Sequence, residues 1–351
     1  MRIALDAFGS DKAPFPEIEG AIQAIKEDIC DEVILVGDEA SLRNDLEKYF
    51  YDKDRIRIEH ASERINMEDH AAEAVRAKKN SSMVRTVQLH MSGAADAAVS
   101  AGNSGAFMTA SLFGYGRIKG VSRPAIAVTL PTMKQPEILL DMGANVDCDA
   151  ENLLQFAQLG TIYFSYIYKV PNPRVALLNI GEENAKGNFM SREAWNLLSQ
   201  AQDLNFVGNI EGKDVLKGDC DVIVCDGFVG NVVLKTIEGA VMAVFELLKE
   251  QLNKDWIAKF GAVLSYPVYS YLRHKLDHTE IGGALLVGLN GCSIVCHGSS
   301  NANAIKNGIQ FAVRTAQAGV VNHTKEYFER ISKCHCTMPN SLLSAATLRQ
   351  R

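Results

Sequence analysis

The stretch CDVIVCDGFVGNVVLKT, residues 220–236, decides the fold. Its apolar run Val222–Val224 predicts a strand buried on both faces, and from residue 229 onward apolar side chains recur at helical spacing. Strand and helix meet at Asp226, and glycines follow it at 227 and 230. A buried strand that passes directly into a helix is the repeating unit of parallel sheets, so this stretch predicts an α/β protein.

The same alternation of strand-like and helix-like segments runs through the rest of the chain, from a strand at 3–8 to a last helix at 300–331. Two strand pairs without a helix between them, at 125–143 and 284–298, suggest some antiparallel pairing. The sequence therefore predicts a three-layer αβα fold around a mostly parallel sheet, with two long helices in 229–277.

No internal repeat and no linker rich in Pro, Gly or Ser interrupts this pattern. We therefore expect residues 1–331 to form a single bilobed domain. Helical periodicity is lost from about Ser332, which predicts that residues 332–351 are a poorly ordered C-terminal extension.

The composition excludes several classes of function. The chain has 351 residues, of which 47% are hydrophobic and 22% charged, and its net charge of -6 gives no basic character suited to nucleic acid. The N-terminal apolar run is short and is interrupted by Asp6, unlike a signal peptide. No uninterrupted apolar stretch reaches the roughly 18 residues that a membrane span needs. We expect a cytoplasmic protein.

The eight cysteines are scattered, which indicates a reducing compartment rather than a disulfide scaffold. Cys225 ends a strand, and it is either a nucleophile or, as the preceding Val-Ile-Val favours, a buried packing residue. Cys334 and Cys336 are separated by one residue and have no second pair. We therefore expect no metal site there, and the sequence predicts no cofactor.

Glycine-rich polar segments follow six of the predicted strands, at 100–106, 139–148, 177–188, 209–214, 224–231 and 296–308. In open α/β sheets ligands bind outside the carboxyl ends of the strands, so we expect these loops to converge on one edge and form a site. The alternative is that glycine and asparagine only make the tight turns that each strand–helix connection needs.

Two of these loops, GNSGA at 102–106 and HGSSNANA at 297–304, open helices. Free N–H groups at a helix N-terminus together with hydroxyls can hold phosphate, although N-capping by Ser104 and Ser300 is the simpler explanation. Neither loop is a Walker or GxGxxG motif, which weakens a nucleotide interpretation. The expected phosphate- or substrate-binding residues are Gly102, Asn103, Ser104, Gly105, Asn145, Asn231, His297, Ser299, Ser300 and Asn301.

Two titratable side chains in these loops have two interpretations each. His297 is either a general acid or base, or a hydrogen-bonded structural imidazole. Lys186 lies in a glycine-bounded loop beside Glu182 and Glu183. It therefore either pairs with these acids at the surface or holds a phosphate or an oxyanion.

The strings SAGNSGA, LLDMGANVDC, LLNIGEENAKGN, CDGFVGNVVLKTIEG and HGSSNANAIKNGI occur in order along the chain. From Met1 to about Ile331 the chain resembles the bacterial phosphate acyltransferase of phospholipid synthesis (the PlsX family). The resemblance implies a homodimeric fold akin to phosphotransacetylases and isopropylmalate dehydrogenase. It also implies transfer of a long-chain acyl group from acyl-[acyl carrier protein] to phosphate, and Lys186 and Asp226 match positions regarded as catalytic in the family.

The resemblance has a local exception. The family usually opens DAMGGDHAP, whereas this chain reads DAFGSDKAP, so Ser10 and Lys12 stand at the glycine and histidine positions while Asp6 and Asp11 match. The residue chemistry otherwise suits the implied reaction. Phosphate is already an anion, so it needs positioning, stabilisation of an oxyanion and exclusion of water rather than a strong base.

Residues 252–276 combine aromatic and apolar side chains with lysine and arginine, which suits an interfacial helix pair; a core or dimer helix is the alternative. The resemblance implies peripheral attachment to the inner face of the membrane through this segment. It also implies that acyl carrier protein, inorganic phosphate and the downstream membrane glycerol-3-phosphate acyltransferase are partners. The side chains expected to face the membrane are Trp256, Phe260, Val263 and Leu264.

Three other functions stay open at this stage. A phosphotransacetylase that uses acyl-CoA is the closest alternative. A metal-dependent hydroxy-acid dehydrogenase would share the fold, but it would need clustered acidic metal ligands and a dinucleotide fingerprint, and neither is clear in the sequence. A non-catalytic binder of carrier protein or lipid surfaces is the third, and the two anion-type loops argue against it.

Overall fold

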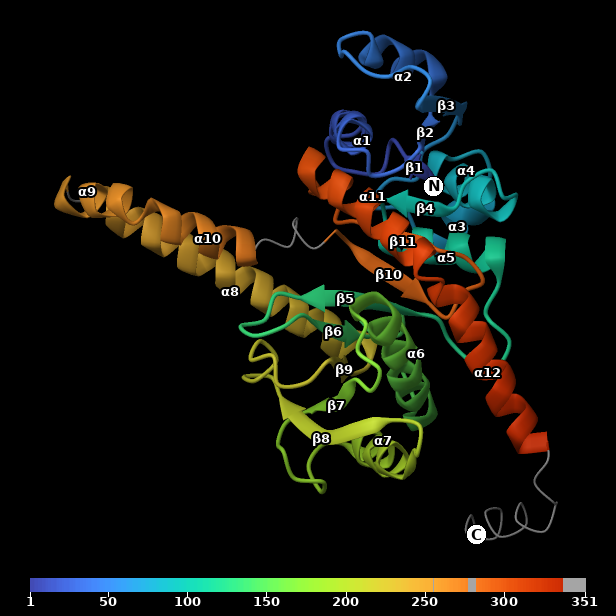
Figure 1. Ribbon diagram of the computed structural model, residues 1–351, viewed down its shortest axis with the longest axis vertical. Helices are drawn as coiled ribbons and strands as arrows, with labels where there is room; N and C mark the ends of the chain where they lie inside the picture. The colour runs from blue at the N-terminus through green and yellow to red at the C-terminus, as the bar shows by residue number, and fades with distance from the viewer. Residues whose placement is uncertain (255, 277–281, 337–351) are drawn as a thin grey trace.

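The computed structural model describes residues 1–254, 256–276 and 282–336 (Figure 1). Its strands are β1 (Arg2–Asp6), β2 (Glu32–Gly37), β3 (Ile56–His60), β4 (Ala97–Ser100), β5 (Ala125–Leu130), β6 (Glu137–Leu140), β7 (Arg174–Asn179), β8 (Asn205–Glu211), β9 (Val222–Val224), β10 (Ala284–Val287) and β11 (Ser293–Val295). Its helices are α1 (Phe15–Lys26), α2 (Glu39–Leu46), α3 (Ala71–Ala77), α4 (Ser82–Met91), α5 (Ser104–Tyr115), α6 (Ala150–Tyr168), α7 (Phe189–Gln200), α8 (Gly227–Lys254), α9 (Trp256–Leu264), α10 (Tyr266–Leu276), α11 (Ala302–Gln317) and α12 (Val320–Cys336).

One sheet of 11 strands runs through the molecule in the order β3-β2-β1-β4-β11-β10-β5-β6-β9-β7-β8. Neighbouring strands are parallel except at the centre, where β11 with β10, β10 with β5, and β5 with β6 are antiparallel. Both strand pairs predicted without an intervening helix are therefore antiparallel neighbours. The prediction of a mixed α/β fold around a mostly parallel sheet is confirmed.

The sheet is covered on both faces, because successive side chains of a strand point to opposite sides. On β4, Val99 belongs to the core that α1, α6 and α11 cover, whereas Ala98 packs on the other face with side chains of α4 and α5. Burying one such apolar side chain stabilises the fold by roughly 1.5–3 kcal/mol for residues the size of Val or Leu. This arrangement explains why the central strands are apolar on both faces.

Of the six glycine-rich loops expected to meet at one edge of the sheet, those after β4, β6, β9 and β11 line one cleft, and those after β7 and β8 do not. The three antiparallel pairings at the centre reverse the strand direction, so β6, β9, β7 and β8 run opposite to β1, β4 and β11. The loops after β6, β7, β8 and β9 therefore leave the sheet in the direction opposite to those after β4 and β11. Helix α8 begins directly after β9 and lines the same cavities as the loops after β4 and β11.

Helices α8, α9 and α10 project from the sheet as an arm (Figure 1). The sequence predicted two helices in this region, and the structure has three. Pro267 lies in the first turn of α10, where its missing N–H removes no helical hydrogen bond. Within α8 only Gly227 and Gly230 are buried, so most of the arm is exposed in the isolated chain.

The single helix predicted at 300–331 is two helices, α11 and α12. They are separated at Gly319, whose φ of +64° lies in the left-handed region and does not belong to a right-handed helix. Helix α12 continues to Cys336, so the loss of apolar periodicity near Ser332 does not end it. Residues 337–351 of the predicted extension lie outside the described residues.

Candidate functional site

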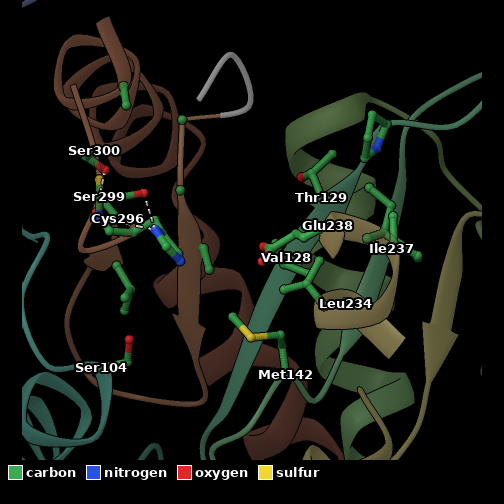
Figure 2. Close-up of a pocket in the computed structure, with 18 of the residues that line it drawn as sticks. Ser104, Val128, Thr129, Met142, Leu234, Ile237, Glu238, Cys296, Ser299 and Ser300 are labelled. Atoms are coloured by element: carbon green, nitrogen blue, oxygen red, sulfur yellow. Dashed lines mark hydrogen bonds between the residues drawn. The ribbon is translucent and has the colours of Figure 1, made fainter. Parts of the chain in front are cut away.

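Two adjoining cavities lie between α5, α8 and the central strands. The first, here called the polar cleft, is lined among others by Asp11, Gly102, Ser104, Gly105, Asn231, Lys235, Glu238, His297 and Ser299. The second, the apolar pocket, is shown in Figure 2. Their volumes of about 660 and 260 Å³ far exceed the roughly 10–15 Å³ that one water molecule needs, so each can hold part of a ligand.

The apolar pocket is bounded by one face of α8 and by the end of β5. Leu234, Ile237 and Val241 lie on α8 at helical spacing, and Val128 and Leu130 come from β5. Figure 2 shows Leu234, Ile237 and Val128 on one side of the pocket and Cys296, Ser299 and Ser300 on the other. The polar cleft shares several lining residues with it, namely Ser104, Met142, Leu234, Glu238, His297 and Ser299. The two cavities therefore form one site with a polar and an apolar half.

The loop before α5 supplies one polar wall. Asn103, not Ser104, is the N-cap: its Oδ1 accepts the Ala106 N–H at 3.0 Å, and its Nδ2 donates to the carbonyls of Met67 and Asp69. This corrects the N-cap expected from the sequence, because asparagine precedes the first helical residue. Ser104 begins the helix and lines both cavities, whereas Asn103 acts as scaffold.

The loop after β11 supplies a second polar wall. His297 Nδ1 lies 2.7 Å from the Ser299 hydroxyl and accepts the Ser299 N–H at 3.2 Å. The Ser300 hydroxyl donates to the His297 carbonyl at 2.6 Å, and Asn301 caps α11 by accepting the Ala304 N–H at 2.9 Å. Asn301, not Ser300, is therefore the N-cap. His297 and Ser299 line both cavities, Ser300 lines the apolar pocket and also bonds the loop, and Asn301 caps the helix.

The loop after β6 is organised by Asp141, which the sequence reasoning did not single out. Its buried carboxylate accepts from the N–H groups of Ile126, Ala144 and Asn145 and from the Asn145 amide, at 2.7–3.2 Å. Burial raises the pKa of Asp141, and these donors oppose the shift. Asn145, expected to bind substrate, instead donates to Asp141 and to the Pro124 carbonyl. The signal was the carboxylate inside the apolar run LLDMGAN.

The turn from β9 into α8 explains the two glycines of the opening stretch. Asp226 is buried and accepts the Val229 N–H at 2.9 Å, so it acts as the helix cap. The Gly227 N–H donates to the Asn145 carbonyl at 2.7 Å. A Cβ at Gly230 would lie 2.0 Å from the Asp141 carbonyl oxygen, so only glycine allows the close approach. The turn thereby locks α8 against the loop after β6.

Cys225 is a packing residue, as the sequence favoured. Its side chain is buried, and its Sγ lies 3.7 Å from the Asp141 carbonyl oxygen. Burial raises the pKa of the Cys225 thiol well above its usual range, so the reactive thiolate is disfavoured.

Lys186 is exposed in the loop after β7 and lines neither cavity. Its backbone N–H donates to the Glu183 carbonyl at 3.1 Å, and Asn179 Nδ2 donates to the Lys186 carbonyl at 3.2 Å. Within the described part of the chain no hydrogen bond or ion pair joins Lys186 to Asp226. The structure therefore does not bring these two predicted catalytic side chains together.

The sequence reasoning missed the cation and the carboxylate that do line the cleft. Lys235 Nζ donates to Glu238 Oε2 at 2.7 Å and lies 3.3 Å from His297 Nε2, on the opposite wall. The signal was available, because Lys235 and Glu238 interrupt the apolar run VVLKTIEGAV on the face that carries Leu234 and Ile237. Of the predicted residues, the cleft gathers Gly102, Ser104, Gly105, Asn231, His297 and Ser299.

The two N-terminal departures from the family pattern, Ser10 and Lys12, line neither cavity. Ser10 is buried, and its N–H donates to Glu17 Oε1 at 2.8 Å, while Arg64 donates to its carbonyl at 3.1 Å. Burial raises the pKa of Glu17 to about 7. Asp11 lines the polar cleft and Lys12 is exposed.

Two further findings concern metals and membranes. In residues 1–254, 256–276 and 282–336, no group of three or more His, Cys, Asp or Glu side chains is placed to hold a metal ion. One described helix, α8, is long and apolar enough to span a bilayer by length and composition, although Lys235 and Glu238 interrupt it. Its N-terminal half lines both cavities, which gives that half a role within the fold.

The chain is similar along most of its length to proteins of known description. A family model described as "Fatty acid synthesis protein" matches residues 1–323. A phosphate acyltransferase of Pelotomaculum thermopropionicum is 50% identical over 326 residues, which are 93% of each chain. A phosphate acyltransferase of Dictyoglomus thermophilum is 46% identical over 335 residues, covering 95% of this chain and 98% of that one.

Solved structures with the same architecture are more distant in sequence. A phosphotransacetylase from Streptococcus pyogenes has a TM-score of 0.60 at 17% identity, covering 91% of this chain and 94% of its own. A branched-chain phosphotransacylase from Enterococcus faecalis has a TM-score of 0.57 at 14% identity, covering 90% and 99%. At these identities the likeness shows the fold alone, and it confirms the predicted phosphotransacetylase-like architecture.

Proposed function

The chain belongs to the family of phosphate acyltransferases, and we propose that it transfers a long-chain acyl group from acyl-[acyl carrier protein] to inorganic phosphate. The observation that carries this proposal is the joined cavity, in which a cleft with hydroxyl, imidazole and ammonium groups opens into an apolar pocket. An acyl phosphate has a charged head and a hydrocarbon chain, so it suits both halves at once.

In the proposed reaction an oxygen of hydrogenphosphate attacks the thioester carbonyl carbon, and a tetrahedral oxyanion forms. Its collapse breaks the C–S bond and leaves the new C–O bond in acyl phosphate. The departing thiolate of the carrier protein takes the proton that hydrogenphosphate loses, so atoms and charge balance without an oxidant or a reductant. The enzyme must orient phosphate, stabilise the oxyanion and keep water away from the product.

The walls of the cleft supply these functions. The N-terminus of α5 carries a partial positive charge, and Ser104 stands at the boundary of the two cavities, where the carbonyl would lie. Donors fixed in this way stabilise a developing oxyanion without reorganisation. The apolar side chains of Leu234 and Ile237 beside this point would exclude water and hold the start of the acyl chain.

Lys186 and Asp226 remain proposed catalytic residues on the family resemblance. The capping bond gives Asp226 a second effect, because it fixes the start of α8 and hence the position of Lys235. Asp226→Asn retains a good N-cap, so a loss of turnover in that variant would report the charge rather than the cap. Lys186→Ala should leave a folded protein with little turnover, and wild-type turnover in it would remove Lys186 from the proposal.

The arm is proposed to contact a second copy of the chain and the membrane. Val244 and Leu247 are exposed on α8, and a continuous exposed apolar surface marks an interaction site. We assign α8 to a homodimer contact and α9 to the headgroup region of the inner membrane face, with the protein otherwise cytoplasmic. The four side chains expected at the membrane, Trp256, Phe260, Val263 and Leu264, are all exposed on α9.

A membrane position would deliver acyl phosphate, which water hydrolyses, to a membrane glycerol-3-phosphate acyltransferase. The alternative substrate is acyl-CoA, because the likeness to phosphotransacetylases is a likeness of fold that does not distinguish the two donors. The deciding experiment incubates purified protein with phosphate and either long-chain acyl-[acyl carrier protein] or acyl-CoA, and traps acyl phosphate with hydroxylamine. Product from acyl-CoA only would favour the alternative, and product from neither would refute both.

A further inference from the structure

Among the described residues that line the polar cleft, Lys235 is the only lysine or arginine. Its Nζ donates to Glu238 Oε2 at 2.7 Å on the same helix and lies 3.3 Å from His297 Nε2 on the facing loop. These two walls come from different halves of the sheet, since α8 follows β9 and His297 follows β11. The ammonium group therefore stands where the two walls meet.

The imidazole of His297 faces Lys235 with Nε2 and Ser299 with Nδ1. The Ser299 N–H points at Nδ1 from 3.2 Å, and the Ser299 hydroxyl lies 2.7 Å from the same atom. When Nδ1 accepts the Ser299 N–H, the proton of the neutral ring is on Nε2; when Nε2 accepts from Lys235, the proton is on Nδ1 and points at the Ser299 hydroxyl. In the first tautomer the ammonium and Nε2–H are both donors, and an anion beside them would accept from both, so such an anion would favour this tautomer.

We propose that Lys235, together with His297 and Ser299, binds the inorganic phosphate that attacks the acyl group. This assignment rests on the proposed function and deepens it. Ser104 at the N-terminus of α5 lines the same cleft and adds a hydroxyl and the helix dipole. Phosphate held there lies beside Leu234, which also lines the apolar pocket, so the attacking oxygen is next to the start of the acyl chain.

Two carboxylates share the cleft and must be reconciled with an anionic ligand. The charge of Glu238 is balanced by Lys235, with which it forms an ion pair at 2.7 Å. Asp11 belongs to the wall under the His297 loop, where its N–H donates to the Gly298 carbonyl at 2.8 Å. Phosphate and Glu238 compete for one ammonium, so Glu238 keeps Lys235 oriented in the empty site and weakens phosphate binding.

This competition gives the proposal a sharp test by steady-state kinetics. Lys235→Met should raise the KM for phosphate at least about tenfold and change the KM for the acyl donor less than about twofold, because a charge-assisted contact to phosphate alone is lost. Glu238→Gln should lower the KM for phosphate. If the pair were merely structural, either substitution would break it, and both variants would shift the phosphate KM in the same direction.

The controls separate this proposal from the proposed function. Lys249→Met removes an exposed lysine of the same helix outside both cavities and should leave the phosphate KM unchanged. Lys235→Arg keeps the positive charge, so it should retain much of the affinity for phosphate. It is the variant to compare with the wild type if Lys235→Met does not fold. As a readout without turnover, phosphate should raise the Tm of the wild type and of Lys249→Met but not of Lys235→Met.

Two outcomes would overturn the assignment: an unchanged phosphate KM in Lys235→Met, or an equal phosphate-induced rise in Tm for Lys235→Met and the wild type. A wild-type protein that forms acyl phosphate while Lys235→Met keeps its phosphate KM would refute this site alone. A wild type that forms no acyl phosphate would refute the proposed function, and the Tm measurement would still decide whether Lys235 binds phosphate.

Discussion

Glu17 offers a quantitative test of the structure. Its side chain is fully buried, Oε1 accepts the Ser10 N–H, and Oε2 is buried without a hydrogen-bond partner in the described residues. Burial raises the pKa of Glu17 from 4.5 to about 7, because desolvation of the carboxylate outweighs the Ser10 hydrogen bond. The protonated form is therefore favoured in the folded protein up to nearly neutral pH.

The sign of the effect follows from linkage. A carboxyl whose pKa is higher in the folded than in the unfolded chain contributes stability that is fully present below pH 4.5 and lost as the pH rises through about 7. The difference of about 2.5 pH units, at about 1.36 kcal/mol per unit, corresponds to roughly 3 kcal/mol of unfolding free energy. Most of this loss should fall between pH 5 and neutral pH.

The assay is urea denaturation of the wild type and Glu17→Gln at several pH values from 5 to 8. We expect the unfolding free energy of Glu17→Gln minus that of the wild type to increase as the pH rises, by up to about 3 kcal/mol. Glu137, whose pKa burial also raises to about 7, is present in both proteins and cancels in the difference. Glu47→Gln removes an exposed carboxylate and controls for net charge. Parallel pH profiles for wild type and Glu17→Gln would refute the reasoning.

Three further predictions concern the site and the arm. Ile237→Trp should fill the apolar pocket and lower kcat/KM for a sixteen-carbon acyl donor at least about tenfold relative to an eight-carbon donor. Val244→Trp, at an exposed position, should not have this effect. Equal losses for both donors in Ile237→Trp would contradict an acyl site in the pocket. Phe260→Glu should weaken co-sedimentation with anionic vesicles, whereas Phe50→Glu, at another exposed phenylalanine, should not, and equal binding would exclude insertion at α9. Asp141→Asn replaces one of two carboxylate oxygens, each of which accepts from two donors, by an NH2 group that faces two of them. It should cost about 1–3 kcal/mol in urea denaturation, and an unshifted midpoint would show that these bonds contribute little.

Much of the fold was predictable because its signals are local. The apolar run before Asp226 and the helical spacing after it determine a strand and a helix whatever lies around them, and the same holds along the chain. The break between α11 and α12 was missed because Gly319 is one small residue in a continuous apolar pattern, and glycine is tolerated within helices as well as between them. Its positive φ is visible only in the structure.

The candidate site was predictable in part, because some of its residues follow strands and others lie within a helix. Ser104, His297 and Ser299 follow strands of the same direction, so the rule that ligands bind at carboxyl ends found them. Lys186 lies outside the cleft, because β7 is farther from β11 in the sheet than β6 and β9, whose loops do line the cleft. Strand direction depends on which strands are neighbours, and no local pattern in the sequence encodes the order of the sheet.

Helix α8 connects the loop after β6 with the loop after β11. Asp226 caps it, Gly230 lets it approach Asp141, and about two and a half turns after the cap Lys235 reaches His297. The distance between the cap and Lys235, nine residues of helix, is about 13 Å at a rise of 1.5 Å per residue. A substitution at Gly230 should therefore disturb the cleft although Gly230 does not line it.

Gly230→Ala would place a Cβ against the Asp141 carbonyl and shift the whole helix. We expect the KM values for both substrates to rise together in that variant, whereas Lys235→Met raises only that for phosphate; a Gly230→Ala variant with wild-type kinetics would show that the cleft does not depend on this contact.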